Sequence, residues 1–262
     1  MNRRDFLKKS LVMTAGGLLL PQYADAWPNR ALRKPGSGSG KGSGTGCMSG
    51  NDANTTLLIH SNTTEGDTTF LDSGKNALCP HVITANGDVH HTTTQKVWGS
   101  SSIAFDGTGD FLTVTHGGSF DLSSSGIPWT IDGFVKFASV AIDQTLFWQD
   151  GTYLGIGQLA TGNLSVRISN GHIQTWAWIP VVGTWYHLAV VRSIADDVIP
   201  YIDGVALGAA FNANAAFGSF DIQIGGNGTS YAAFNGYMDE IRISNVARWT
   251  GNFTKPFGPY CD

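Results

Sequence analysis

The sequence predicts an all-β protein in which two antiparallel sheets pack as a jelly-roll sandwich. Charged residues make up only 14% of the 262 residues, and glutamate occurs twice against eighteen aspartates, whereas glycine occurs 34 times. Helical proteins draw on Glu and Lys, while this composition is typical of strands and turns. Hydrophobic residues make up 42%, which is enough for a full core and excludes a disordered chain.

Short alternating runs, separated by turn dipeptides, predict the individual strands. The dipeptides combine Asn or Asp with Gly, as at Asn86-Gly87 and Asp203-Gly204, and favour tight hairpins. A dozen such runs without a helical period indicate a sandwich or jelly roll. The expected strands are Thr56–His60, Ser102–Asp106, Phe111–Thr115, Thr130–Phe137, Gln144–Trp148, Tyr153–Ile156, Leu164–Ile168, Ile173–Trp178, Trp185–Arg192, Ile199–Ile202, Phe220–Ile224 and Tyr237–Ser244.

The N-terminal segment has the three parts of a cleavable export signal. Basic residues that include Arg3 and Arg4 precede a short apolar stretch at 11–20, and Ala24 and Ala26 provide a small-x-small cleavage site. The apolar stretch is too short to span a bilayer. The arginine pair resembles the twin-arginine signal, which exports folded proteins in bacteria. We therefore expect a periplasmic or extracellular protein.

Three regions follow from this interpretation: a twin-arginine-type signal peptide at 1–26, a basic leader with a Gly/Ser linker at 27–46, and one domain at 47–262. The domain carries 8 basic and 18 acidic residues, so it would repel a phosphate backbone and is not expected to bind nucleic acid. No segment after the signal is apolar enough for a membrane span. The sequence does not indicate an oligomeric state.

Five segments in register resemble the laminin G-like jelly-roll domains of the concanavalin A-like lectin and glucanase superfamily. They are Phe105–Val114, Trp129–Phe137, Gly183–Arg192, Tyr201–Gly204 and Asn235–Trp249, and the resemblance extends from about residue 55 to 257. The segment 58–62 departs from the family pattern, with Asn62 where many members have Asp. The resemblance implies a concanavalin A-like sandwich that binds sugars or proteins, often carries calcium, and rarely catalyses by itself.

Three functions remain in order of preference. The first is an exported, non-catalytic protein that binds a glycan. The second is a structural or adhesion protein that binds an extracellular protein or the cell surface. The third is a divergent glycoside hydrolase or lyase, which is disfavoured because the related glucanases use a Glu-x-Asp-x-x-Glu strand, and neither Glu65 nor Glu240 occurs in that spacing.

The ligand-binding hypothesis centres on aromatic residues, because sugars stack their apolar faces on aromatic rings. Trp176 and Trp178 are two apart in an expected strand, so both project from the same side of one sheet. The alternative is that both fill the core, which is the commoner fate of a tryptophan in a sandwich. The hypothetical site comprises Trp148, Tyr153, Asn170, His172, Gln174, Trp176 and Trp178.

Calcium is a more plausible metal than zinc, because it prefers carboxylates and carbonyls from turns, whereas Cys79, His81, His90 and His91 lack the paired spacing of a zinc finger. Alternation places Asp239 on the same face as Ile241 and Ile243, where an unpaired carboxylate is costly. Either Arg248 pairs with it, or a calcium ion binds it together with Asp72 or Asp106.

The three cysteines, Cys47, Cys79 and Cys261, remain after signal cleavage in an oxidising compartment, so one disulfide and one free thiol are expected. In the fold that the resemblance implies, the first and last strands are neighbours. Cys261 is therefore expected to bond to Cys47 or to Cys79, and Cys47 is the preferred partner.

Overall fold

The structure, a computed structural model, describes residues 47–118, 120, 122, 124–149, 154–168, 172–214, 220–227 and 233–262. The expected signal peptide and linker, with Arg3, Arg4, Ala24 and Ala26, lie outside these residues. The described part contains sixteen strands and no α-helix, so it also contains no helix that could cross a membrane.

The strands are β1 (Thr55–Ile59), β2 (Ile83–Asn86), β3 (His90–Thr92), β4 (Ser102–Asp106), β5 (Phe111–Val114), β6 (Trp129–Phe137), β7 (Gln144–Gln149), β8 (Leu154–Leu159), β9 (Asn163–Ile168), β10 (His172–Ala177), β11 (Trp185–Arg192), β12 (Asp197–Ile202), β13 (Val205–Ala206), β14 (Phe211–Asn212), β15 (Ile222–Ile224) and β16 (Asn235–Ser244).

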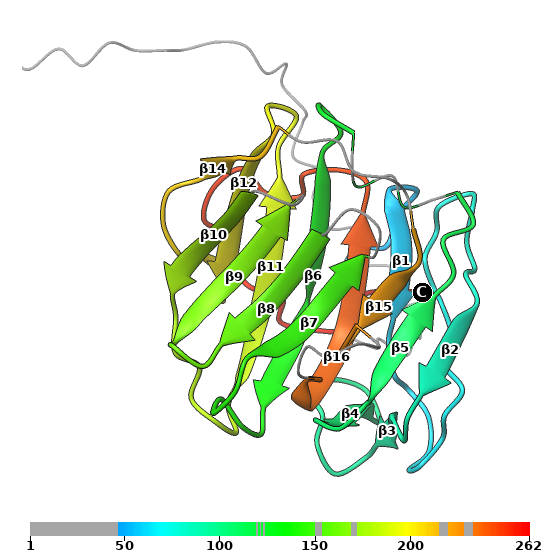
Figure 1. Cartoon of the computed structure of the whole chain (residues 1–262). Helices are drawn as coiled ribbons and strands as arrows, with labels where there is room; N and C mark the ends of the chain where they lie inside the picture. Colours follow the sequence, from blue (N-terminus) through cyan, green and yellow to red (C-terminus); the bar gives the residue numbers. More distant parts are fainter. Residues whose placement is uncertain are drawn as a thin grey trace, which may run out of the picture. The chain divides into compact units, whose positions relative to one another are not determined.

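Two antiparallel sheets lie face to face, which confirms the predicted sandwich (Figure 1). The seven-stranded sheet has the order β10-β9-β8-β7-β15-β5-β2. The nine-stranded sheet has the order β13-β12-β11-β6-β16-β4-β3, with β1 paired to β16 and β14 paired to β12. β1 and β4 follow one another along the same side of β16, since β4 pairs with its first half and β1 with its second.

All twelve expected strands are present, and Ser102–Asp106 and Trp185–Arg192 have the expected bounds. The other bounds differ by a few residues. The strands that the sequence did not reveal are β2, β3, β13 and β14, which have two to four residues each. Runs this short contain too few positions to show an alternation.

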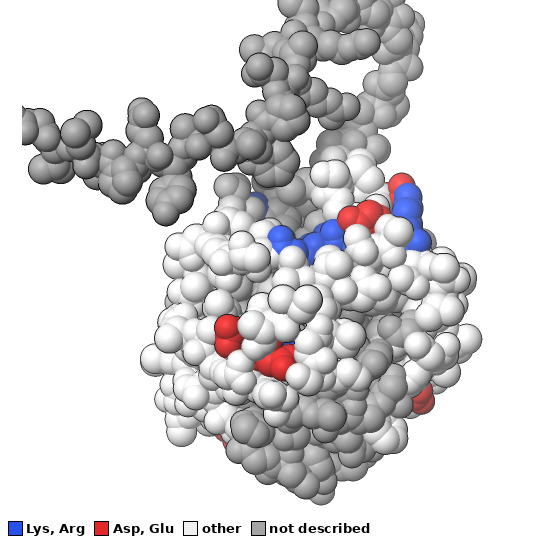
Figure 2. Space-filling view, turned by 90° about the horizontal axis from the view of Figure 1, so that it is seen from above, with Lys and Arg blue, Asp and Glu red and all other residues white. Residues whose placement is uncertain are grey.

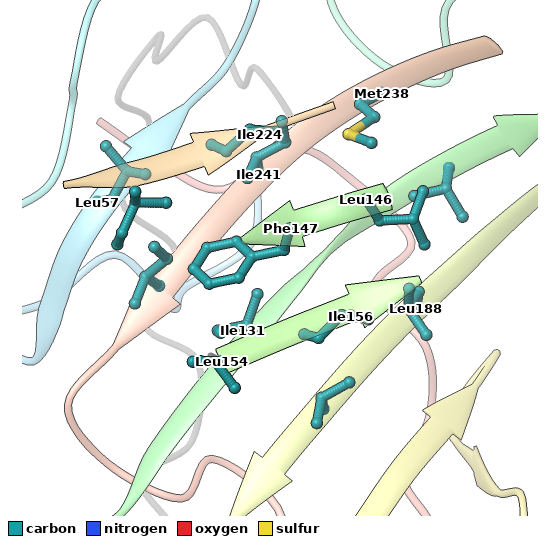
Figure 3. Packing of buried hydrophobic residues seen from close by; sticks show 14 of the residues in the cluster. Leu57, Ile131, Leu146, Phe147, Leu154, Ile156, Leu188, Ile224, Met238 and Ile241 are labelled. Atoms are coloured by element: carbon teal, nitrogen blue, oxygen red, sulfur yellow. The ribbon is translucent and has the colours of Figure 1, made fainter. Parts of the chain in front are cut away.

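The core lies between the two sheets and is almost entirely apolar (Figure 3). Leu146 and Phe147 of β7 and Ile156 of β8 project toward Ile131 and Leu188 of the opposite sheet. Burying an aliphatic or aromatic side chain of this size stabilises the fold by roughly 1.5–3 kcal/mol. Alternate residues face inward along most strands, as the sequence pattern predicted, but in β7 a register shift between Thr145 and Phe147 turns the consecutive residues Leu146 and Phe147 both toward the core.

The outer face of the nine-stranded sheet holds a buried polar network around Asp132. Its carboxylate accepts hydrogen bonds from Arg242 (Nε 2.9 Å, Nη2 3.1 Å), His187 (Nε2 3.2 Å) and the Tyr260 hydroxyl (2.7 Å). All four residues are at most 4% exposed. Since Tyr260 belongs to the C-terminal segment, this segment closes over the sheet.

A bulge in β16 changes the orientation of Asp239. Asp239 pairs with Phe134 and Arg242 pairs with Asp132, so two residues of β16 intervene where regular pairing would place one, and Glu240 between them has φ 52°. Asp239 therefore faces outward with Arg242. The expectation that it shares a face with Ile241 is wrong, because simple alternation does not survive a bulge.

Cys47 and Cys261 form a disulfide, which confirms the preferred pairing, and Cys79 is a free thiol. The backbone next to the disulfide forms a short parallel bridge between Met48 and Tyr260. The bond thus joins the start of the domain to the C-terminal segment.

Candidate functional site

The outer face of the seven-stranded sheet presents one residue from each strand in a continuous cross-strand row. The residues that alternate with this row, such as Leu112, Phe147 and Val166, are buried in the core. The row itself is half-buried or exposed over most of its length, so it faces away from the other sheet. It consists of Thr84, Thr113, Gln223, Trp148, Gly155, Arg167 and Ile173.

A trough of about 270 Å³ lies on this face, over β8 and its two neighbours. Its floor includes Gly155 and Gly157, which leave the outward positions of β8 without side chains. Trp148 of β7 stands on one side, and Ser165 and Arg167 of β9 stand on the other. We call this feature the β8 trough. It combines an aromatic ring with hydroxyl and guanidinium donors, which is the composition of a site for a polar ligand with apolar faces.

Trp176 and Trp178 do not form an exposed platform. Trp176 is 7% exposed, its ring packs against Phe211, and its Nε1 donates to the Ala209 carbonyl (3.2 Å). Trp178 is half-buried and packs edge-on against Phe137 and Tyr186. The two tryptophans do share a face, but it is the core-facing one, so the alternative interpretation is the correct one for this pair.

The remaining residues of the hypothetical site do not gather around the tryptophan pair. Gln174 is exposed on β10 and pairs with Val166, a core residue, so it belongs to the same side of the sheet as Trp176 and the opposite side from Trp148. Tyr153 and Asn170 lie outside the described residues, as does the side chain of His172. Of the seven residues, Trp148 is the one that the structure places on the β8 trough.

The three aspartates considered for calcium lie in three different environments. Asp72 accepts hydrogen bonds from the backbone of Leu58, Gly74 and His81 and from His81 Nδ1 (2.7 Å), so its oxygens are engaged by protein donors. Although burial raises its pKa, the hydrogen bond from His81 and the backbone bonds lower it below the usual value.

Asp239 is fully buried, and one oxygen accepts the backbone amides of Val97 and Trp98 (both 3.1 Å). Burial, together with the neighbouring Glu240, raises its pKa well above the usual value. The other oxygen has no hydrogen-bond partner among the described residues. Arg248 does not pair with Asp239, since its guanidinium binds Asp52 (2.8 Å).

Asp106 lies with Asp88 and Asp110, and their carboxylate oxygens are all within 4.8 Å of one another. Asp110 uses its oxygens to accept the backbone amides of Asp88 and Asp106. The structure therefore does not bring Asp239 together with Asp72 or Asp106. Among the described residues, the Asp88–Asp106–Asp110 group is the all-carboxylate set whose spacing could hold a cation.

The sequence alone did not reveal four residues of the β8 trough, which are Gly155, Gly157, Ser165 and Arg167. The signal that could have revealed the two glycines is the Gly-x-Gly alternation at 155–157, which begins in the expected strand Tyr153–Ile156 and continues one residue beyond its expected end. Glycine weakens a strand interior and often marks a close approach by another group. Two glycines on one face of β8 thus indicated the floor of a site more directly than the aromatic spacing did.

Charge is sparse on the described surface. Figure 2 shows that most of the surface seen from above is uncharged, and that basic groups lie beside acidic ones. Ion pairs account for several of the cations, including Lys255 with Asp203 (3.1 Å) and Arg248 with Asp52.

Comparison with known proteins gives one family. A laminin G-type family model, described as the concanavalin A-like lectin/glucanases superfamily, matches residues 106–250. No curated protein matches the sequence.

Solved structures with a similar fold include domain 4 of AbnA, a GH43 extracellular arabinanase from Geobacillus stearothermophilus, in complex with arabinotriose. The identity is 22%, the TM-score is 0.56, and the match covers 74% of this chain and 94% of that one. A structure of botulinum neurotoxin type C, whose cell entry depends on interaction with two ganglioside molecules, has 12% identity and a TM-score of 0.54, and the match covers 74% of this chain and 48% of that one.

The binding domain of botulinum neurotoxin DC in complex with rat synaptotagmin II has 12% identity and a TM-score of 0.53, with 74% and 48% covered. This chain thus spans about half the length of the neurotoxin chains. At these identities the similarity shows the fold.

Proposed function

This chain belongs to the concanavalin A-like lectin/glucanase superfamily, and we propose that it is a non-catalytic protein that binds carbohydrate in the β8 trough. The observation that carries the proposal is the position of Trp148 beside a floor without side chains, with Ser165 and Arg167 opposite. An indole offers an apolar surface to sugar C–H groups, while hydroxyl and guanidinium groups take the sugar hydroxyls. The arabinotriose bound to the similar AbnA domain supports this ligand class.

The β8 trough is lined by too few carboxylates for hydrolysis among the described residues, which supports a binding role. Glycosidases need two carboxyl groups across the scissile bond, about 5–9.5 Å apart. Asp143 is the one carboxylate among the described residues that line the trough, and it accepts a hydrogen bond from the Ala160 amide (2.8 Å). Glu240 is 1% exposed and bonds His60 and the Tyr260 amide, so it is inaccessible to a polysaccharide.

Replacing Trp148 with Ala should abolish most of the carbohydrate affinity while leaving the fold intact. We expect binding to weaken about tenfold, because stacking and apolar contact with the ring are lost. The measurement is affinity electrophoresis against a panel of soluble polysaccharides that includes arabinan, with thermal unfolding of the same samples.

Trp176→Ala is the matched control, since Trp176 lies on the other side of the same sheet. This change should destabilise the protein by about 3 kcal/mol, as expected for a large-to-small change in a core. Retention of the Trp148→Ala variant equal to that of the parent would contradict the proposal. If no polysaccharide retains the parent protein but an extracellular protein binds it, the adhesion role would be favoured.

We also propose that the protein is exported through its N-terminal segment. Replacing Arg3 and Arg4 with Lys should leave unprocessed protein in the cytoplasm, because Lys keeps the charge but not the guanidinium geometry. The measurement is fractionation of expressing bacteria, followed by mass determination of the mature N-terminus. Normal export and cleavage of the double Lys variant would show that the twin-arginine interpretation is wrong.

A further inference from the structure

Gly155 and Gly157 both lie on the floor of the β8 trough, but different groups occupy the space above them. A Cβ atom on Gly155 would lie 2.9 Å from Cε3 and from Cζ3 of Trp148, and 3.8 Å from Cβ of Arg167. Carbon atoms in contact are normally 3.5–4.0 Å apart. The edge of the Trp148 indole therefore occupies the space that a side chain at position 155 would fill.

At Gly157 the obstacle is main chain. A Cβ atom there would lie 2.6 Å from the carbonyl oxygen of Gln144. The pairing of β7 with β8 shifts register between Thr145 and Phe147, next to this point. Because β8 pairs with β7 on one side and with β9 on the other, neither backbone can move away easily. The glycine at position 157 is thus required by the fold.

We propose that Gly155 is a positioning residue for Trp148, which lets the indole lean over β8 and sets its place opposite Arg167. The consequence for ligand affinity rests on the proposed carbohydrate site, whereas the position of the ring does not. In Gly155→Ala the strand stays in place and the indole moves, because rotation of a half-buried side chain is easier than displacement of a strand that is paired on both sides. The ring then no longer presents the same surface to a sugar.

The experiment observes the ring directly. Protein labelled with 5-fluorotryptophan gives a ¹⁹F resonance for each tryptophan, and the resonance of Trp148 is identified by its absence in Trp148→Phe. In Gly155→Ala we expect this resonance to shift while the core resonances of Trp129 and Trp176 stay in place. The same variant should bind about tenfold more weakly to the polysaccharide that retains the parent protein in affinity electrophoresis, or to arabinotriose. This loss should be close to that in Trp148→Ala.

Gly251→Ala is the control for a glycine-to-alanine change, because a Cβ atom at this exposed position would meet nothing within 4 Å. It should leave the resonances, the affinity and the melting temperature unchanged. Gly157→Ala should lower the melting temperature, which Gly155→Ala should do far less.

An unmoved Trp148 resonance in Gly155→Ala would overturn the proposal. A moved resonance with unchanged affinity would support the positioning role of Gly155 and would contradict its consequence for ligand affinity. If no carbohydrate binds the parent protein, the proposed function fails, and the resonance alone then decides whether Gly155 positions the ring.

Discussion

Replacing Cys261 with Ser should lower the free energy of unfolding by about 3–5 kcal/mol. The disulfide joins residues 214 positions apart, and a crosslink over so long a loop removes much of the conformational entropy of the unfolded chain. The change should also release the C-terminal segment, whose Tyr260 bonds Asp132 and Glu240. Urea unfolding followed by circular dichroism measures the effect.

Cys79→Ser is the matched control. The Cys79 thiol is half-buried and lies 3.4 Å from the Thr56 carbonyl, so a hydroxyl can occupy its place at little cost. Burial raises the pKa of this thiol to about 12, so it stays protonated near neutral pH.

Reductant provides a second control. It should lower the stability of the parent protein to that of Cys261→Ser and leave the stability of that variant unchanged. Equal stability of parent and Cys261→Ser under oxidising conditions would contradict this account.

Replacing Asp132 with Asn should cost about 3–5 kcal/mol, because it leaves the charge of Arg242 buried without its counter-ion. Arg242 is 2% exposed and has a further bond to the Gly50 carbonyl (2.9 Å), so it cannot turn toward solvent. The double variant with Arg242→Met should recover part of the loss, and a double-mutant cycle on urea unfolding measures the coupling. Strictly additive single effects would show that the pair does not interact.

The Asp132 carboxylate also makes the free energy of unfolding depend on pH in the acidic range. Burial alone would raise the pKa of Asp132, but the charge of Arg242 and the hydrogen bond from His187 lower it from 3.8 to about 2. Since the folded value lies below the unfolded one, this stabilisation is complete above about pH 4 and is lost as the pH falls toward 2. The gap in stability between the parent and Asp132→Asn should therefore narrow by about 2 kcal/mol over that interval.

The sequence predicted the sandwich because its strands carry their own local signal. Each run such as Trp185–Arg192 alternates between apolar residues for the core and residues for the other face, and the turn dipeptides separate the runs. The bulge at Glu240 could not be predicted in this way. It lies where the pairing of β16 with β4 ends and its pairing with β1 begins, and these pairings join segments far apart in the chain.

The candidate site was predicted only in part, for a related reason. The spacing of Trp176 and Trp178 shows that they share a face, but it does not show which face the other sheet covers. That choice depends on the pairing of β10 with β9, which aligns Trp176 with the core residue Leu164. Trp148 belongs to the opposite face because it pairs with Gly155 and not with a core residue.

The disulfide determines how the domain responds to mechanical load. A pulling force applied at Cys47 enters the fold by two routes, through β1 and, across the sulfur atoms, through the C-terminal segment to β16. β1 and β16 are antiparallel neighbours in which Thr55 faces Ser244, so both routes reach the sheet at the same end. A pull at Cys47 therefore loads β1 and β16 together, and β1 does not carry it alone.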